Sequence, residues 1–141
     1  MVKTMMYRVI GSIFVVVHTD AAPGADEWSE YLAYYRENAH GKATLVVTDG
    51  GGPNAKQRAM VNEFLEKTDM KPKIAICTDR RVTRGIVTAL GWFNKNIRVY
   101  ATQDSDIEEA LMYLGVAGSD GATTVSAVRG LRQELVELAA S

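Results

Sequence analysis

The chain has 141 residues, 47% of them hydrophobic, which is enough for one compact domain around a single core. Sixteen basic and seventeen acidic residues give a formal net charge of −1, so bulk electrostatics give no reason to expect nucleic acid or anionic membranes as main partners. A local basic patch stays compatible with this balance. The single Cys77 cannot form an internal disulfide, and no apolar run reaches the roughly 20 residues that span a bilayer. We therefore expect a cytoplasmic protein without stable membrane insertion.

The first part of the chain predicts a β-hairpin, then a helix, then a buried strand. Residues 6–10 and 13–18 are rich in β-branched and aromatic side chains, and the Gly-Ser pair between them suits a two-residue turn. Between Pro23 and Gly41 the apolar residues recur at three and four positions, which indicates a helix. Residues 43–48 are apolar on both faces, as expected for a central strand covered by helices.

The following segments continue this alternation. Residues 54–68 and 82–93 show helical periodicity, whereas 73–77 and 97–101 are short apolar runs typical of strands. The sequence Ser-Asp-Ile-Glu at 105–108 has the spacing of a capping box, which predicts the start of another helix. The element order predicts a single α/β domain with a mixed sheet of about five strands and helices packed on it.

A further helix is predicted at the C-terminal end. Residues 116–122 are small and polar, and we expect them to form a linker between the domain at 6–115 and a helix at 123–140. Apolar residues recur in this helix at three and four positions, so one face either docks on the sheet or pairs with a second copy in a homodimer. The expected oligomer contact consists of Val128, Leu131, Leu135 and Leu138.

Three strand-like runs end on the dipeptide Thr-Asp, at 19–20, 48–49 and 78–79. Ligands and partners of open α/β sheets collect where parallel strands hand over to helices. The middle run is followed by three glycines, which permit positive φ and close approach of another molecule. We therefore predict an interaction or anion-binding site formed by Asp20, Thr48, Asp49, Gly50, Gly51, Gly52, Asn54, Lys56, Asp79, Arg80 and Arg81.

The chemistry of this edge has several interpretations. An anion could bind at the helix N-terminus, although the turn lacks the Gly-Lys-Ser/Thr ending of a P-loop. The three aspartates could share Mg²⁺, but strand-end Asp more often forms turns or caps, and carboxylates on nonadjacent strands lie too far apart to share an ion. We expect Asn54 to be an N-cap and Thr48 to bond the local backbone. No catalytic residue, metal ligand or cofactor is predicted.

Two segments carry a resemblance to a known family. A strand at 45–49 turns through small residues into a helix, and 98–114 runs from Arg-Val-Tyr into the helix Glu-Glu-Ala-Leu-Met-Tyr-Leu. With the opening hairpin and the helix–strand alternation, these segments resemble the STAS superfamily, more narrowly its SpoIIAA-like branch, over residues 7–115. The resemblance implies a STAS-like domain to which the C-terminal helix is added.

The resemblance also carries a functional expectation. In family members that act as anti-sigma factor antagonists, the segment after the central strand reads Asp-Ser-Ser-Gly, and one Ser accepts phosphate from a partner kinase. The matching residues 49–52 read Asp-Gly-Gly-Gly and offer no hydroxyl. The resemblance thus implies a non-enzymatic regulatory domain that binds a protein partner without a phospho-switch. The alternatives are a module for a small anion or for a lipid near 82–93, and a metal-dependent phosphate enzyme that uses the strand-end aspartates.

Overall fold

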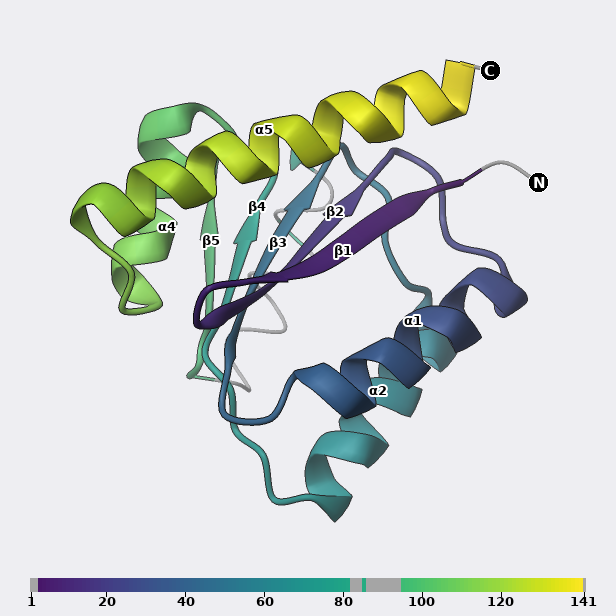
Figure 1. Ribbon diagram of the computed structural model, residues 1–141. Coiled ribbons are helices and arrows are strands. Elements are labelled where there is room, and N and C mark those ends of the chain that lie inside the picture. Colours follow the sequence, from purple (N-terminus) through teal and green to yellow (C-terminus); the bar gives the residue numbers. More distant parts are fainter. Residues whose placement is uncertain (1–2, 82–84, 86–94, 141) are drawn as a thin grey trace.

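Residues 3–81, 85 and 95–140 are described by the computed structural model, with element labels as in Figure 1, where α3 is not used. Five strands form one sheet in sequential order, in which the first two strands are antiparallel and all other neighbours are parallel. The predicted α/β class and mixed five-stranded sheet are confirmed. The strands are β1 (Met5–Ile10), β2 (Ile13–His18), β3 (Ala43–Thr48), β4 (Ile74–Cys77) and β5 (Ile97–Tyr100).

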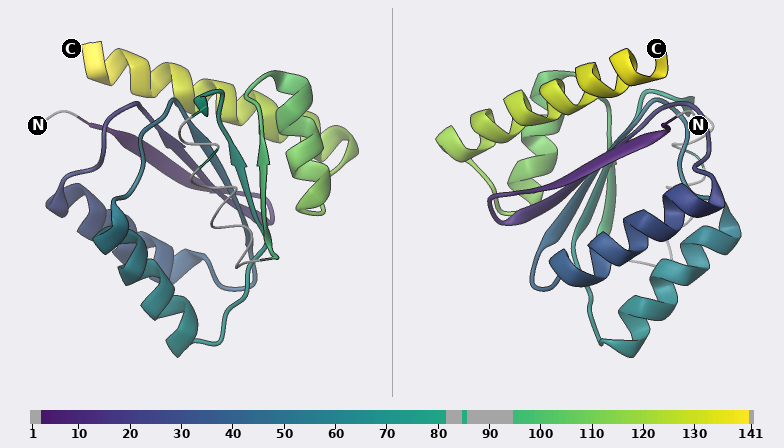
Figure 2. Two further views of the ribbon diagram at one scale, coloured as in Figure 1. Left: turned by 180° about the vertical axis from the view of Figure 1, so that it is seen from behind. Right: turned by 45° about the vertical axis from the view of Figure 1, so that its right-hand side comes forward.

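In the described part of the chain, two pairs of helices sandwich this sheet. Helices α1 (Ala25–Asn38) and α2 (Ala55–Lys67) connect parallel strands and cover one face, because right-handed crossovers between sequential neighbours place the helices on the same side. Helices α4 (Asp104–Tyr113) and α5 (Gly118–Ala140) cover the other face (Figures 1 and 2). Because β2, β3 and β4 are parallel, their carboxyl ends lie at one edge of the sheet and their amino ends at the opposite edge.

The second strand of the sheet, β2, shows why two cores form. All six of its residues are buried, and successive side chains point to opposite faces. Val15 and Val17 pack with α4 and α5, whereas Phe14 and Val16 pack with the aromatic residues of α1. Phe14 meets the ring of Tyr35 edge-on at 5.1 Å between centroids, a favourable aromatic arrangement.

The last helix is longer and more deeply docked than the sequence indicated. It begins at Gly118, so most of the segment predicted as a linker over 116–122 is helical. Val128, Leu131 and Leu135 are buried against the chain's own sheet, while Leu138 is 43% exposed. Docking within the chain is confirmed, and the expectation that the three buried residues form an oligomer contact is corrected. Within the described ranges, no helix is long and apolar enough to cross a membrane.

Two further predictions concern the start of α4 and the segment at 82–93. Helix α4 begins at Asp104, and its capping box joins Gln103 to Asp106, so the box predicted at 105–108 is wrong by two residues. The predicted helix at 82–93, and with it the alternative of a lipid site there, lies almost entirely outside the described residues. The predicted interaction site at the strand ends, in contrast, lies within the described residues.

Candidate functional site

The ends of β2 and β3 are tied together at the predicted edge. His18 lies opposite Thr48 in the sheet register. Beyond the strands, the N–H of Asp49 donates to the carbonyl of His18 at 3.2 Å, and the N–H of Gly51 donates to the carbonyl of Thr19 at 2.9 Å. The loop after β2 and the turn after β3 therefore form one hydrogen-bonded unit.

The hydroxyl of Thr48 closes this turn. Its side chain is buried, accepts a hydrogen bond from the N–H of Gly50 at 3.0 Å and donates one to the carbonyl of Gly51 at 2.6 Å. The expected local role of Thr48 is confirmed. Both the donor and one acceptor position of the hydroxyl are used inside the turn, which fixes the backbone of the three following residues, 49–51.

Each of the three glycines has a physical reason. Gly50 and Gly52 have φ values of 121° and 144°, a backbone region that other residues rarely adopt. At Gly51 the reason is space, because a Cβ there would lie 2.4 Å from the carbonyl oxygen of Ala21 and 2.5 Å from that of Thr19. The turn is therefore packed against the loop after β2, a contact that the sequence analysis did not predict.

The predicted N-cap of α2 is confirmed as a full capping box. The Asn54 side chain accepts from the Gln57 N–H at 2.8 Å, and the Gln57 side chain accepts from the Asn54 N–H at 2.9 Å. The Gln57 amide also donates to the carbonyl of Pro23 at 2.9 Å. Together with Gly50 and Gly51, four backbone N–H groups that could hold an anion at this turn are already donating within the chain.

Charged side chains at the edge are paired with different partners. The carboxylate of Asp49 lies 3.0 Å from the guanidinium of Arg132 on α5, and its carbonyl accepts from Arg80 Nε at 3.0 Å. The carboxylate of Asp79 instead accepts from the N–H of Thr102 at 3.2 Å and from the Thr102 hydroxyl. These pairs are partly exposed, so each contributes little to stability.

The aspartates do not form a metal centre. Asp20 is exposed on the loop after β2, while Asp49 and Asp79 have the separate partners just described. Among the residues that the structure describes, no group of three or more His, Cys, Asp or Glu side chains could hold a metal ion. The geometry gives the metal-dependent alternative no support.

Arg132 and Thr102 belong to this edge but were not predicted. Arg132 is 83 residues from Asp49 in the chain, and nothing in its local pattern links it to a strand end. Thr102 follows β5 and is the fourth strand-end threonine, so extending the Thr-Asp pattern to single threonines could have found it. Lys56 and Arg81, in contrast, were predicted and are exposed.

Fold and edge together define a class of protein, an α/β domain with a mixed five-stranded sheet, helices on both faces and a hydrogen-bonded glycine turn at the strand ends. No family model, no curated protein and no solved structure matches the chain.

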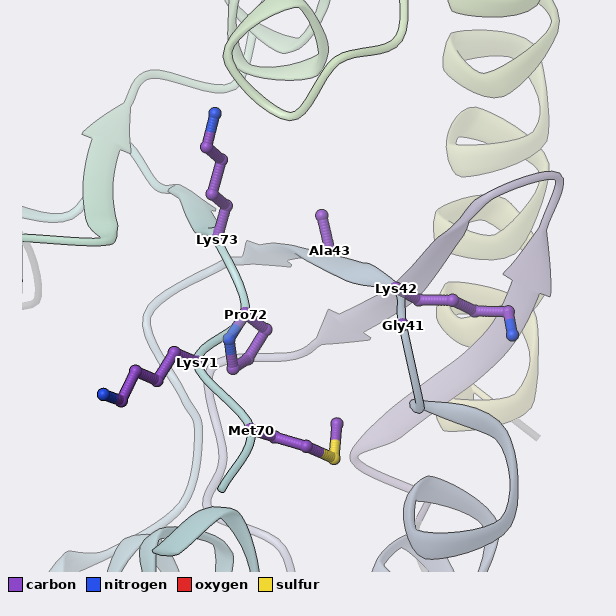
Figure 3. Close-up of a pocket in the computed structure, with 7 residues that line it drawn as sticks. All are labelled: Gly41, Lys42, Ala43, Met70, Lys71, Pro72 and Lys73. Carbon is purple, nitrogen blue, oxygen red and sulfur yellow. The ribbon is translucent and has the colours of Figure 1, made fainter. Parts of the chain in front are cut away.

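Two open pockets lie at the opposite edge of the sheet. One, with a volume of about 330 Å³, is lined by residues 41–43 and 70–73 (Figure 3). The other, of about 390 Å³, shares Met70, Lys71 and Pro72 with the first. Neither pocket includes a residue of the predicted site, so the concave surface and the glycine turn are separate features.

His18 is expected to make stability depend on pH. Burial at the end of β2 lowers its pKa from 6.5 to about 4. The unfolded chain therefore binds this proton at a higher pH than the folded chain. The contribution of His18 to stability is intact above pH 6.5 and is lost as the pH falls toward 4, a change of about 3 kcal/mol in the free energy of unfolding.

Urea unfolding measured across this pH range tests the prediction. His18→Gln removes the titrating group and should flatten the slope of stability against pH, whereas the matched variant His40→Gln, at an exposed position, should keep it. A slope that is unchanged in His18→Gln would contradict the assignment.

Cys77 is expected to resist thiol reagents in the folded protein. The residue is fully buried in β4, and burial raises the pKa of its thiol from 9.0 to about 12. Because the thiolate is the reactive form, modification by a disulfide reagent should be slow without denaturant and should accelerate sharply through the unfolding transition. Rapid labelling of the native protein would show that β4 is accessible.

Proposed function

We propose that this chain is a non-enzymatic regulatory domain that binds a protein partner through the turn after β3, in the manner of STAS-type modules and without a phospho-switch. Its contact surface, called here the turn surface, consists of the exposed side chains of Asp49, Asn54, Lys56, Arg80 and Arg81. One observation carries the proposal. The Thr48 hydroxyl and four backbone amides form hydrogen bonds within the chain and fix the turn, while Asp49, Asn54 and Lys56 on that turn are exposed. Such preorganisation reduces the entropic cost of binding.

The same hydrogen bonds weigh against the rival functions. A small anion at the glycine turn would need several free N–H groups, and four of those at the turn, from Gly50, Gly51, Asn54 and Gln57, already have acceptors. Phosphate transfer to the turn would need a free hydroxyl, and Thr48 is buried. Recognition by exposed side chains requires neither group.

The terminal helix leaves this surface accessible. Arg132 of α5 reaches Asp49, but the Asp49 side chain is still 53% exposed, and both Asn54 and Lys56 are exposed. α5 thus borders the turn surface without covering it. Recognition of a partner through the turn requires no displacement of the helix.

Affinity capture with a charge-reversed variant tests the proposal. Lys56→Glu combined with Arg81→Glu changes two exposed side chains of the turn surface, and a carboxylate in the first turn of α2 is compatible with the helix dipole. We expect the wild-type domain to retain a defined protein from native lysate of its source. The double variant should retain at least about tenfold less, because reversing two charges disrupts the electrostatic complementarity of the interface.

The matched control is Lys3→Glu combined with Arg8→Glu, which changes the net charge equally at exposed positions on and beside β1. This control should retain the partner as the wild type does. Equal recovery by both double variants, or recovery of no protein by the wild type, would refute the proposal.

A further inference from the structure

The pocket at the amino ends of β3 and β4 is basic. Its lining contains three lysines, Lys42, Lys71 and Lys73, and no carboxylate, although the whole chain has a net charge of −1. None of these lysines takes part in the ion pairs found among the described residues. We call the pocket formed by 41–43 and 70–73 the basic pocket.

The sheet places the backbone segments that carry these lysines side by side. The N–H of Thr44 donates to the carbonyl of Lys73 at 2.9 Å, which sets the segment before β4 against the start of β3. Lys73 Nζ lies 5.3 Å from the centroid of the Tyr113 ring, and the guanidinium carbon of Arg98 lies 4.5 Å from the same centroid. The ring holds two cations beside the pocket.

The directions of the lysines indicate the shape of the ligand. Figure 3 shows the three ammonium groups pointing away from one another. Ala43, Met70 and Pro72 line the pocket between the lysine-bearing positions. A single small anion needs donors that converge, so this arrangement does not fit inorganic phosphate. An extended chain whose negative charges are spaced along its length can reach the cations one after another.

The adjoining pocket indicates whether the extended ligand is a nucleic acid or a peptide. It continues from Met70, Lys71 and Pro72 to the apolar residues Leu65 and Ile74, and its lining also includes two acidic residues, Glu66 and Asp69. A nucleic acid carries a phosphate at every nucleotide and would be repelled there. A peptide can place acidic side chains in one pocket and apolar side chains in the next.

We propose that the basic pocket is a second docking surface, which binds an acidic peptide segment followed by apolar residues. The acidic side chains contact Lys42, Lys71 and Lys73, and the apolar ones lie over Met70 and Pro72 into the adjoining pocket. This surface is at the opposite edge of the sheet from the turn surface and does not depend on it.

Fluorescence polarisation with a labelled peptide, Glu-Glu-Asp-Glu-Leu-Leu-Gly-Ser, tests this surface at low salt. We expect saturable binding that weakens as salt is added. Lys42→Glu combined with Lys71→Glu should weaken it at least about tenfold, because attraction becomes repulsion. The matched variant Lys3→Glu with Arg8→Glu, and the turn-surface variant Lys56→Glu with Arg81→Glu, should bind the peptide as the wild type does.

The outcomes separate this proposal from others. Absence of binding at millimolar peptide, or equal binding by the pocket variant and the matched variant, would overturn the docking surface. Tighter binding of a deoxythymidine oligonucleotide or of phosphatidylserine vesicles than of the peptide would overturn the partner class. Loss of peptide binding in the turn-surface variant would show that the two edges are not independent.

Discussion

A chain that ends after Ala117 is expected not to fold cooperatively. The truncation removes four buried aliphatic side chains that complete the core on one face of the sheet: Val125, Val128, Leu131 and Leu135. Burial of each contributes about 1.5–3 kcal/mol, so their combined loss approaches the roughly 5–15 kcal/mol that stabilises a whole domain. Near-ultraviolet circular dichroism and urea unfolding should show a chain without fixed tertiary packing.

A substitution on the exposed side of the same helix provides the control. Val136 is 57% exposed, and Val136→Ser should change the free energy of unfolding by less than about 0.5 kcal/mol. A truncated chain that keeps a sharp transition near that of the intact protein would mean that α5 is an appendage after all, as the predicted linker implied.

Gly51→Ala is expected to destabilise the domain by about 2–3 kcal/mol, because the added methyl group overpacks the turn. The new Cβ would lie within 2.8 Å of three backbone atoms of Thr19 and Ala21, none of which can rotate away. The loop after β2 and the turn after β3 must therefore separate. The midpoint of urea unfolding measures the cost.

Gly130 offers the matched comparison. It lies on the exposed side of α5, and a Cβ there would meet nothing within 4 Å. Gly130→Ala should stabilise the domain by about 0.5–1 kcal/mol through helix propensity. If Gly51→Ala proves as harmless, the close approach of turn and loop is wrong, and with it the rigidity of the turn surface. Because a side chain at Gly51 would disturb the fold itself, a bulky substitution there cannot test binding.

Local patterns explain what the sequence predicted. The hairpin, the alternation of helices with parallel strands from β2 to β4 and the cap at Asn54 depend on residues within a few positions of one another, and all are confirmed. The start of α4 was harder because two overlapping segments both have capping-box spacing. The box from Gln103 to Asp106 forms, and the neighbouring Thr102 is held by Asp79 across the sheet edge.

Long-range contacts explain what the sequence could not predict. The apolar stripe of α5 was visible, but the same stripe suits the chain's own sheet or a second copy. Only the three-dimensional fold places Leu131 in the core and Arg132 beside Asp49. The approach of Gly51 to Ala21 is likewise a contact between two loops. The basic pocket could not be predicted from local pattern, because its lysines lie in segments that precede two different strands.

Site-specific photocrosslinking tests the central claim, that the turn surface is where a partner binds. Benzoylphenylalanine introduced at Lys56 should, on irradiation in native lysate, form a covalent adduct with a defined protein. The same group at Ser29, an exposed position on α1, should form none. An adduct from position 29 alone, or from neither position, would contradict the proposed function.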